Sequence, residues 1–142
     1  MRYLPTIVGQ VDVTPMRSTG PWWRRWSTRK QWRLTSDLVV VVFGIRFKID
    51  KGTVADFASV PRFLVPLLPP DAVFSAASLL HDHLYQTGKT SKWFADAIFF
   101  DVLRRGENIT WLTAGVMWLA VWLFGWPAWA EHRRRDTKRA ET

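Results

Sequence analysis

Three things are missing from this sequence, and each absence excludes a class of structure or chemistry. The chain has no cysteine, which excludes disulfides, thiolate zinc sites and cysteine nucleophiles. Residues 1–20 contain no apolar core segment, so we expect no secretion through a cleavable signal. Residues 109–130 contain no charged side chain, which sets them apart from the rest of a strongly basic protein.

Tryptophan and positive charge are abundant. The 142 residues include 10 tryptophans and carry a formal net charge of +8, which favours an anionic partner such as a nucleic acid or an anionic lipid surface. The stretch PWWRRW at residues 21–26 suits a surface that stacks nucleic-acid bases or an interfacial membrane anchor. We favour a packed loop as the explanation of this stretch. No nucleic-acid motif surrounds it, so nucleic-acid binding is the least favoured of these functions.

The length and the pattern predict one α+β domain. Residues 1–30 hold Pro5, Gly9 and Pro15 and are expected to be irregular or to form a short edge strand. Residues 31–130 are the expected domain, and residues 131–142 are an expected basic, disordered tail. A β-branched run at residues 39–43, followed by alternation at 45–49, predicts a small antiparallel sheet of two or three strands.

A pair of helices is predicted over residues 71–105. Asp71 is a suitable N-cap for the first helix, and Ser91 is a suitable N-cap for the second. The connection QTGKT is short and polar, and Gly88 can take the left-handed conformation that ends a helix. So short a connection predicts an antiparallel helix hairpin.

The hairpin brings His81 and Asp96 to the same level, because they lie equally far from the midpoint between Gly88 and Lys89. If both face the seam, Asp96 can accept a proton from one imidazole nitrogen and leave the other nitrogen as a base or a metal ligand. Tyr85 shares that face of the helix. Asp82 lies about a quarter turn away, where it could hold a cation. The alternative is a buried polar pair that only fixes helix register.

A loop between the sheet and the hairpin offers further polar residues. Asp56, Ser59 and Arg62 lie in an otherwise apolar setting and could complete a site beside His81. Asp56 and Ser59 could equally brace the loop by bonding backbone amides. We favour the brace for Ser59, and Asp56 stays a candidate metal ligand.

The uncharged segment 109–130 predicts a strongly apolar C-terminal helix. Its length could cross a hydrocarbon core of about 30 Å, and tryptophans near both ends with arginines beyond fit membrane anchoring. Gly125 and Pro127 shorten the reliable helix to the length of a buried core helix. From Val116 to Phe124 the segment is apolar on every side. We therefore expect part of it to form an exposed patch that docks to a membrane or to a partner subunit.

The order of several motifs resembles a phage and prophage family known as domain of unknown function 1353. GTVADFASVPRFL, AASLLHDHLY and SKWFADAIFFDVL carry the resemblance, which covers about residues 31–125. It implies a bacteriophage or prophage origin, a location in the virion or the host cell, and a small mixed α/β domain without an established activity. Ala55 stands where threonine is usual, Lys92 where arginine is usual, and Trp122 where arginine is common.

The helix pair with HD-x-x-Y also resembles the catalytic helices of phospholipases A2, more weakly. By that resemblance His81 would activate water, Asp82 would bind Ca²⁺ and Asp96 would orient His81. No Gly-rich calcium loop of the phospholipase kind is present. We therefore expect a metal-assisted hydrolase site at His81, Asp96 and Tyr85, with Asp82 and Asp56 as candidate metal ligands. The resemblance and the Trp-rich apolar segment together imply a lipid ester as the substrate. The alternative is a non-catalytic virion or membrane-associated protein, with a phage structural protein or a second copy as partner.

Overall fold

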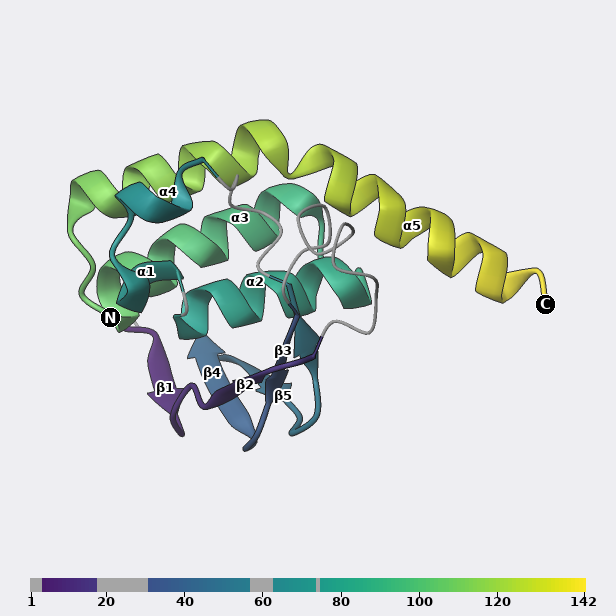
Figure 1. Cartoon of the computed structure of the whole chain (residues 1–142), viewed down its shortest axis with the longest axis horizontal. Helices are drawn as coiled ribbons and strands as arrows, with labels where there is room; N and C mark the ends of the chain where they lie inside the picture. The colour runs from purple at the N-terminus through teal and green to yellow at the C-terminus, as the bar shows by residue number, and fades with distance from the viewer. Residues whose placement is uncertain (1–3, 18–30, 57–62, 74) are drawn as a thin grey trace.

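The computed structural model describes residues 4–17, 31–56, 63–73 and 75–142, and Figure 1 shows their arrangement. The strands lie at one side of the molecule, and helices α2, α3 and α4 are stacked on them in that order. Helix α5 continues from α4 and extends beyond the body, with the C-terminus at its far end. This confirms the α+β fold class.

Strands occur in two three-stranded antiparallel sheets, where a single sheet of two or three strands was expected. The first has the order β1-β4-β5, formed by Thr6–Val8, Leu38–Val42 and Ile45–Ile49. The second has the order β2-β3-β6, formed by Val13–Pro15, Trp32–Leu34 and Val54–Ala55.

A two-residue turn fixes the register of the β4–β5 hairpin. Phe43 and Gly44 both have positive φ, 53° and 77°, which is the backbone twist that matches the strands of a tight hairpin. Val40 therefore pairs with Phe47 on one side and with Ile7 of β1 on the other. Residues 6–8 and 13–15 pair with the sheets as short edge strands, which is the second of the two alternatives expected for the N-terminal region.

The helical part of the chain starts with two short elements, η2 and α1, and continues with longer helices. Their bounds are η2 Val65–Leu67, α1 Pro70–Val73, α2 Ala76–Thr87, α3 Lys92–Asp101, the π-helical turn η3 Val102–Gly106, α4 Trp111–Phe124 and α5 Trp126–Ala140. Asp71 does not cap the first hairpin helix. It lies in the first turn of α1, and Ser75 caps α2 by accepting from the Ser78 amide.

The hairpin itself is confirmed. Gly88 ends α2 in the left-handed conformation at φ 61°, and the Ser91 hydroxyl accepts a hydrogen bond from the Phe94 amide at the start of α3. A cap of this kind typically contributes about 1 kcal/mol. The two caps together set where α2 ends and α3 begins, and hence which residues meet across the seam.

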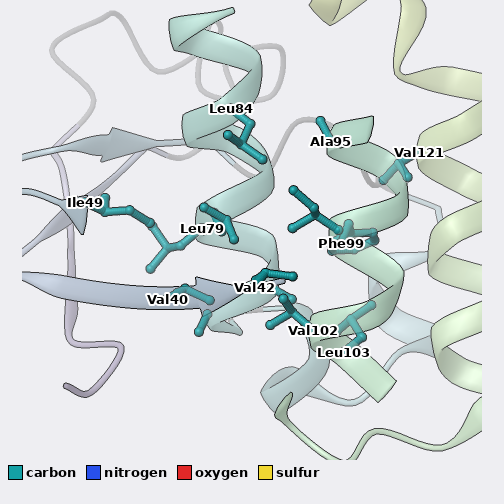
Figure 2. Close-up of a cluster of buried hydrophobic side chains, with 14 of the residues drawn as sticks. Val40, Val42, Ile49, Leu79, Leu84, Ala95, Phe99, Val102, Leu103 and Val121 are labelled. Atoms are coloured by element: carbon teal, nitrogen blue, oxygen red, sulfur yellow. The ribbon is translucent and has the colours of Figure 1, made fainter. Parts of the chain in front are cut away.

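The core lies between the first sheet and the hairpin, with α2 in the middle (Figure 2). Val40 and Val42 of β4 face α2, while Leu79 on α2 faces the strands. Phe99 and Val102 are buried as well, and Phe99 packs against the His81 ring of α2. Full burial of such a side chain contributes about 1.5–3 kcal/mol, so this cluster holds the hairpin rigidly on the sheet.

The expected apolar helix of residues 109–130 is divided at Gly125 into α4 and α5, whose axes differ by 52°. Pro127 has no amide hydrogen and its ring crowds the carbonyl four residues before it, so a straight helix cannot continue. No single described helix is long and apolar enough to cross a membrane; only the bent α4–α5 pair meets that test of length and composition.

Residues 131–140 are helical, which corrects the expected disordered tail. Arg133 accounts for much of the order, because its guanidinium donates to the Tyr85 carbonyl at 2.6 Å and lies over the Trp129 ring at 4.5 Å. Glu131 and Arg135 form an i,i+4 ion pair on the exposed side. Anchoring to α2 thus stabilises a segment whose composition alone favours disorder.

Candidate functional site

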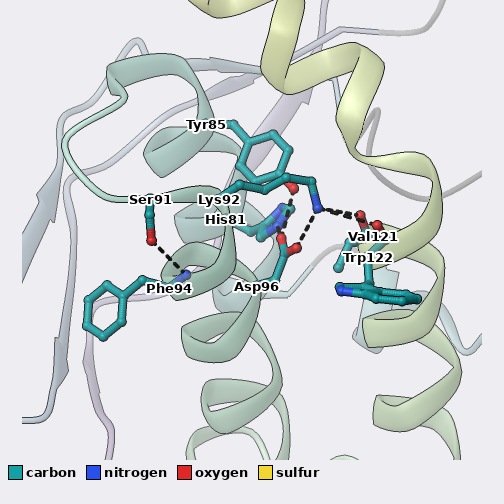
Figure 3. A network of polar contacts seen from close by, with 8 residues as sticks. All are labelled: His81, Tyr85, Ser91, Lys92, Phe94, Asp96, Val121 and Trp122. Carbon is teal, nitrogen blue, oxygen red and sulfur yellow. Dashed lines mark hydrogen bonds and ion pairs between the residues drawn. The ribbon is translucent and has the colours of Figure 1, made fainter.

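One carboxylate between α2 and α3 accepts three hydrogen bonds (Figure 3). The His81 Nε2 lies 2.7 Å from Asp96 Oδ1, and the Tyr85 hydroxyl donates to the same oxygen at 2.8 Å. The Lys92 Nζ donates to Asp96 Oδ2 at 2.7 Å. The predicted meeting of His81, Tyr85 and Asp96 across the seam is confirmed.

The fold holds the imidazole in place on several sides. His81 and Tyr85 are four residues apart on α2, and their rings lie 4.2 Å apart between centroids. Phe99 of α3 lies 4.9 Å away, measured in the same way. His81 and Asp96 are each only 1% exposed. The ring therefore has one orientation, set by packing and by the Asp96 carboxylate.

Lys92 is the member of the network that the sequence did not reveal. Its side chain is 2% exposed, although it lies at the start of α3 where lysine usually faces water. Its ammonium also lies 3.3 Å from the Val121 carbonyl and 3.4 Å from the Trp122 carbonyl of α4, and 5.0 Å from the Trp126 ring centroid. The i,i+4 spacing between Lys92 and Asp96 was the sequence feature that could have indicated this ion pair.

The electrostatics define the protonation states. Burial would raise the pKa of Asp96, but hydrogen bonds from His81, Lys92 and Tyr85 outweigh it and hold that pKa below its ordinary value. Burial lowers the pKa of His81, against the opposing effect of Asp96. Burial, together with the Asp96 charge, raises the pKa of Tyr85. These pKa shifts favour an ionised Asp96, a neutral His81 and a neutral Tyr85 at neutral pH.

The tautomer of His81 follows from these states. An ionised Asp96 can only accept, so the proton of neutral His81 is on Nε2 and the lone pair is on Nδ1. Such an imidazole can take a proton from water, and the resulting imidazolium would be stabilised by Asp96. The arrangement has the parts of a general base and its orienting carboxylate.

The candidate metal ligands are not gathered into a recognisable site. Asp82 is buried, and its charge adds to the effect of burial in raising the pKa of Tyr85. The charge of Asp56 lies near His132 of α5, whose pKa burial lowers and Asp56 raises. In the described part of the chain, no group of three or more His, Cys, Asp or Glu side chains could hold a metal ion. Calcium binding stays a prediction, and no chemical step below uses it. Ser59, Arg62 and residues 21–26 lie outside the described residues.

Asp56 instead lines a polar cavity of about 290 Å³ between β6, the end of α2 and α5. Gln86 donates from this wall to the Val54 carbonyl at 2.9 Å. The described residues around the cavity are Gln31, Val54, Asp56, Gln86, His132, Arg135, Asp136 and Arg139. The sequence pattern did not predict this cavity, because α5 was expected to be disordered.

Fold and site together define an α+β protein with a buried His–Asp–Lys–Tyr network on a helix hairpin. The chain belongs to the protein family described as "Protein of unknown function (DUF1353)", which it matches over residues 32–121. The match includes α2, α3, most of α4 and all four residues of the network. Comparisons with curated proteins and with solved structures gave no match.

Proposed function

We propose that the protein is a hydrolase of lipid esters in which His81 is the general base. The observation that carries the proposal is the 2.7 Å contact between His81 Nε2 and Asp96 Oδ1, with Tyr85 and Lys92 holding the same carboxylate. This is the arrangement of base and orienting carboxylate that the likeness to phospholipases A2 implies. A phage or prophage origin, and a place in the virion or the host cell, are part of this proposal.

In the proposed reaction, His81 Nδ1 accepts a proton from a water molecule as the water oxygen attacks the ester carbonyl carbon. The imidazolium that forms keeps its Nε2–H on Asp96, whose carboxylate balances the new charge. Nδ1 then returns its proton to the alkoxide as the C–O bond breaks. Lys92 and Tyr85 are positioning residues, because they hold Asp96 and do not touch the reacting atoms.

A lipid ester is the substrate class that fits the rest of the molecule. Lys92 connects the site to the end of α4 through the carbonyls of Val121 and Trp122. The outer face of α4 carries exposed apolar side chains such as Leu119 and Leu123. A substrate held in an apolar phase would thus meet the protein on the helix that adjoins the network.

The near-complete burial of His81 and Lys92 favours a second candidate function, that of a non-catalytic accessory protein. In that case the network joins α2, α3 and α4 and only specifies their packing. Buried polar networks with every group satisfied commonly fix a unique arrangement of helices. The two candidates differ in what happens when His81 loses its ability to transfer a proton.

Replacing His81 by Asn tests the proposal, since an amide can keep some hydrogen bonding but cannot act as the base. We expect hydrolysis of phospholipid vesicles to fall by about 10²–10⁴-fold, with little change in melting temperature. Fatty acid release, measured by titration, is the readout. His83→Asn is the matched control, because His83 lies two residues away outside the network and should leave hydrolysis unchanged.

Wild-type protein without esterase activity on phospholipid and neutral ester vesicles would overturn the hydrolase proposal. A lowered stability of His81→Asn by about 1–3 kcal/mol, with no activity to lose, would support the structural role instead. Melting temperatures of His81→Asn and His83→Asn, measured side by side, separate the two outcomes.

A further inference from the structure

Helix α4 is apolar on two opposite faces. Ala114, Met117 and Val121 form the face that packs against the rest of the domain. The outer face carries Leu112, Val116, Leu119 and Leu123, which recur at helical spacing on one side and are exposed, Leu112 by 71%. The expected exposed patch on the uncharged segment is confirmed.

Aromatic side chains extend this outer face at both ends. Trp111 is exposed at the beginning of α4 and Trp126 just beyond its end. Exposed Phe63 makes an edge-to-face contact with Phe124, with ring centroids 6.3 Å apart, and so widens the patch. We call this surface the α4 patch; it comprises Phe63, Trp111, Leu112, Val116, Leu119, Leu123, Phe124 and Trp126.

A hollow of about 650 Å³ opens on this side between α3 and α4. Phe100, Trp118 and Leu119 contribute to its wall, which is almost entirely apolar. Asp101 is the charged residue among the described lining residues, and its carboxylate is held by Arg105 at 2.6 Å. An acyl chain could enter such a hollow without meeting an unpaired charge.

The helix that follows the patch is basic. Helix α5 carries five cations, Arg133, Arg134, Arg135, Lys138 and Arg139, against Glu131 and Asp136, a net charge of +3. Arg133 and Arg135 are engaged in ion pairs with Asp136 and Glu131. Exposed Arg134 and Lys138 form no ion pair with the described residues, which leaves them able to meet external anions.

We propose that the α4 patch docks parallel to the surface of an anionic lipid bilayer, with the cations of α5 on the headgroups. Apolar side chains would enter the boundary of the acyl region, and tryptophan is the residue typical of that depth. The charge of α5 favours an anionic bilayer over a second copy of the same basic chain. The proposal goes beyond catalysis and does not require His81 to act as a base.

Flotation with phosphatidylglycerol vesicles, compared with phosphatidylcholine vesicles, tests the docking on the full chain. We expect binding to phosphatidylglycerol that weakens with salt. Leu112→Glu combined with Leu119→Glu should reduce it by at least about tenfold, since two charges would enter the apolar boundary. The control pair, Val8→Glu with Ile45→Glu, makes the same charge change at exposed positions of the first sheet and should bind better than the patch variant.

A second variant tests the role of the positive charge on α5. Arg134→Gln with Lys138→Gln should weaken binding to phosphatidylglycerol by about 10- to 30-fold, because each cation near an anionic surface contributes about 1 kcal/mol. Binding to phosphatidylcholine should change little. Equal losses on the two kinds of vesicle would contradict a role for α5 on the headgroups.

A label provides a measurement that does not depend on damaging the patch. The chain has no cysteine, so Leu112→Cys and Val8→Cys each give one site for an environment-sensitive fluorophore. Phosphatidylglycerol vesicles should shift the emission at position 112 to the blue and leave position 8 unchanged. A shift at both positions or at neither would overturn the proposed orientation.

Two further results separate this proposal from its rivals. His81→Asn should still float with vesicles, so that a loss of hydrolysis and a loss of docking remain distinct failures. Wild-type protein that does not float, but sediments as a dimer that Leu112→Glu with Leu119→Glu dissociates, would show that a second copy covers the patch. That result would overturn the docking proposal.

Discussion

Asp96 carries a negative charge that water does not reach, and the surrounding residues compensate for it in two ways. Lys92 supplies the opposite charge at one oxygen, while His81 and Tyr85 supply neutral donors at the other. Removing an ionised group from water costs several kcal/mol, which is recovered only if the remaining acceptor positions are also satisfied. Lys92, His81 and Tyr85 therefore each contribute to holding the Asp96 charge in the core.

Replacing Lys92 by Met should leave Asp96 buried without a counter-charge. We expect a loss of about 3–5 kcal/mol in the free energy of unfolding, measured by urea denaturation. Adding Asp96→Asn to Lys92→Met should restore part of this loss, because the uncompensated charge is then gone. Lys92→Arg should be tolerated far better, since it keeps the charge. A loss below about 1 kcal/mol in Lys92→Met would contradict the proposed compensation.

The His81–Asp96 contact was predictable and the Lys92 contact was not, for a physical reason. A short connection fixes the level at which two antiparallel helices meet, so counting from the turn suffices for His81 and Asp96. The burial of Lys92 depends on the carbonyls at the end of α4, about thirty residues further along. Local spacing places Lys92 beside Asp96 but does not show what covers it.

At the scale of elements, some features are determined by neighbouring residues in the sequence and others by contacts between distant segments. Ser91 and Gly88 act within one turn of chain, and both were predicted from sequence. The division of the strands into two sheets, and the helical state of residues 131–140, depend on contacts between distant segments. Composition correctly marks residues 131–142 as basic but cannot show that Arg133 reaches the end of α2.

Gly88 and Gly115 offer a matched pair of glycine substitutions. Gly88 has φ 61°, and a Cβ there would meet the guanidinium of Arg133, which holds α5 to α2. Gly88→Ala should therefore cost about 1–2 kcal/mol in unfolding free energy. Gly115 lies inside α4, where an added Cβ would meet no atom within 4 Å, so Gly115→Ala should stabilise by about 0.4–1 kcal/mol. Urea denaturation measures the unfolding free energy of both variants. Two changes of the same sign would contradict this explanation.

At the scale of the whole molecule, α4 carries apolar side chains both on the face that packs on the core and on the face that is exposed. The sequence shows that it lacks a polar stripe, and from this it predicts that one side must be covered by something else. Which side is covered by the domain follows only from the packing of Ala114, Met117 and Val121. The patch was therefore predictable as a property of the segment, whereas its outline required the fold.

The buried network should make global stability depend on pH. His81 has a folded pKa below its ordinary value of 6.5, so on acidification the unfolded chain binds that proton first, and stability falls as the pH drops below about 6.5. The lowered pKa of Asp96 has the same sign, with loss beginning below about 3.8. Tyr85, with a raised pKa, should cause a loss above about pH 10.

Burial also lowers the pKa of His83 and of His132, so all three histidines contribute to the dependence of stability on pH. A comparison with a variant that lacks His81 isolates the contribution of His81. Unfolding free energies of the wild type and of His81→Asn should be measured between about pH 7 and about pH 5. We expect the wild type to lose more stability over this interval, because the variant keeps His83 and His132 but has no titrating group at position 81. Parallel curves would mean that His81 has the same proton affinity in the folded and unfolded states, in conflict with a neutral imidazole held by burial.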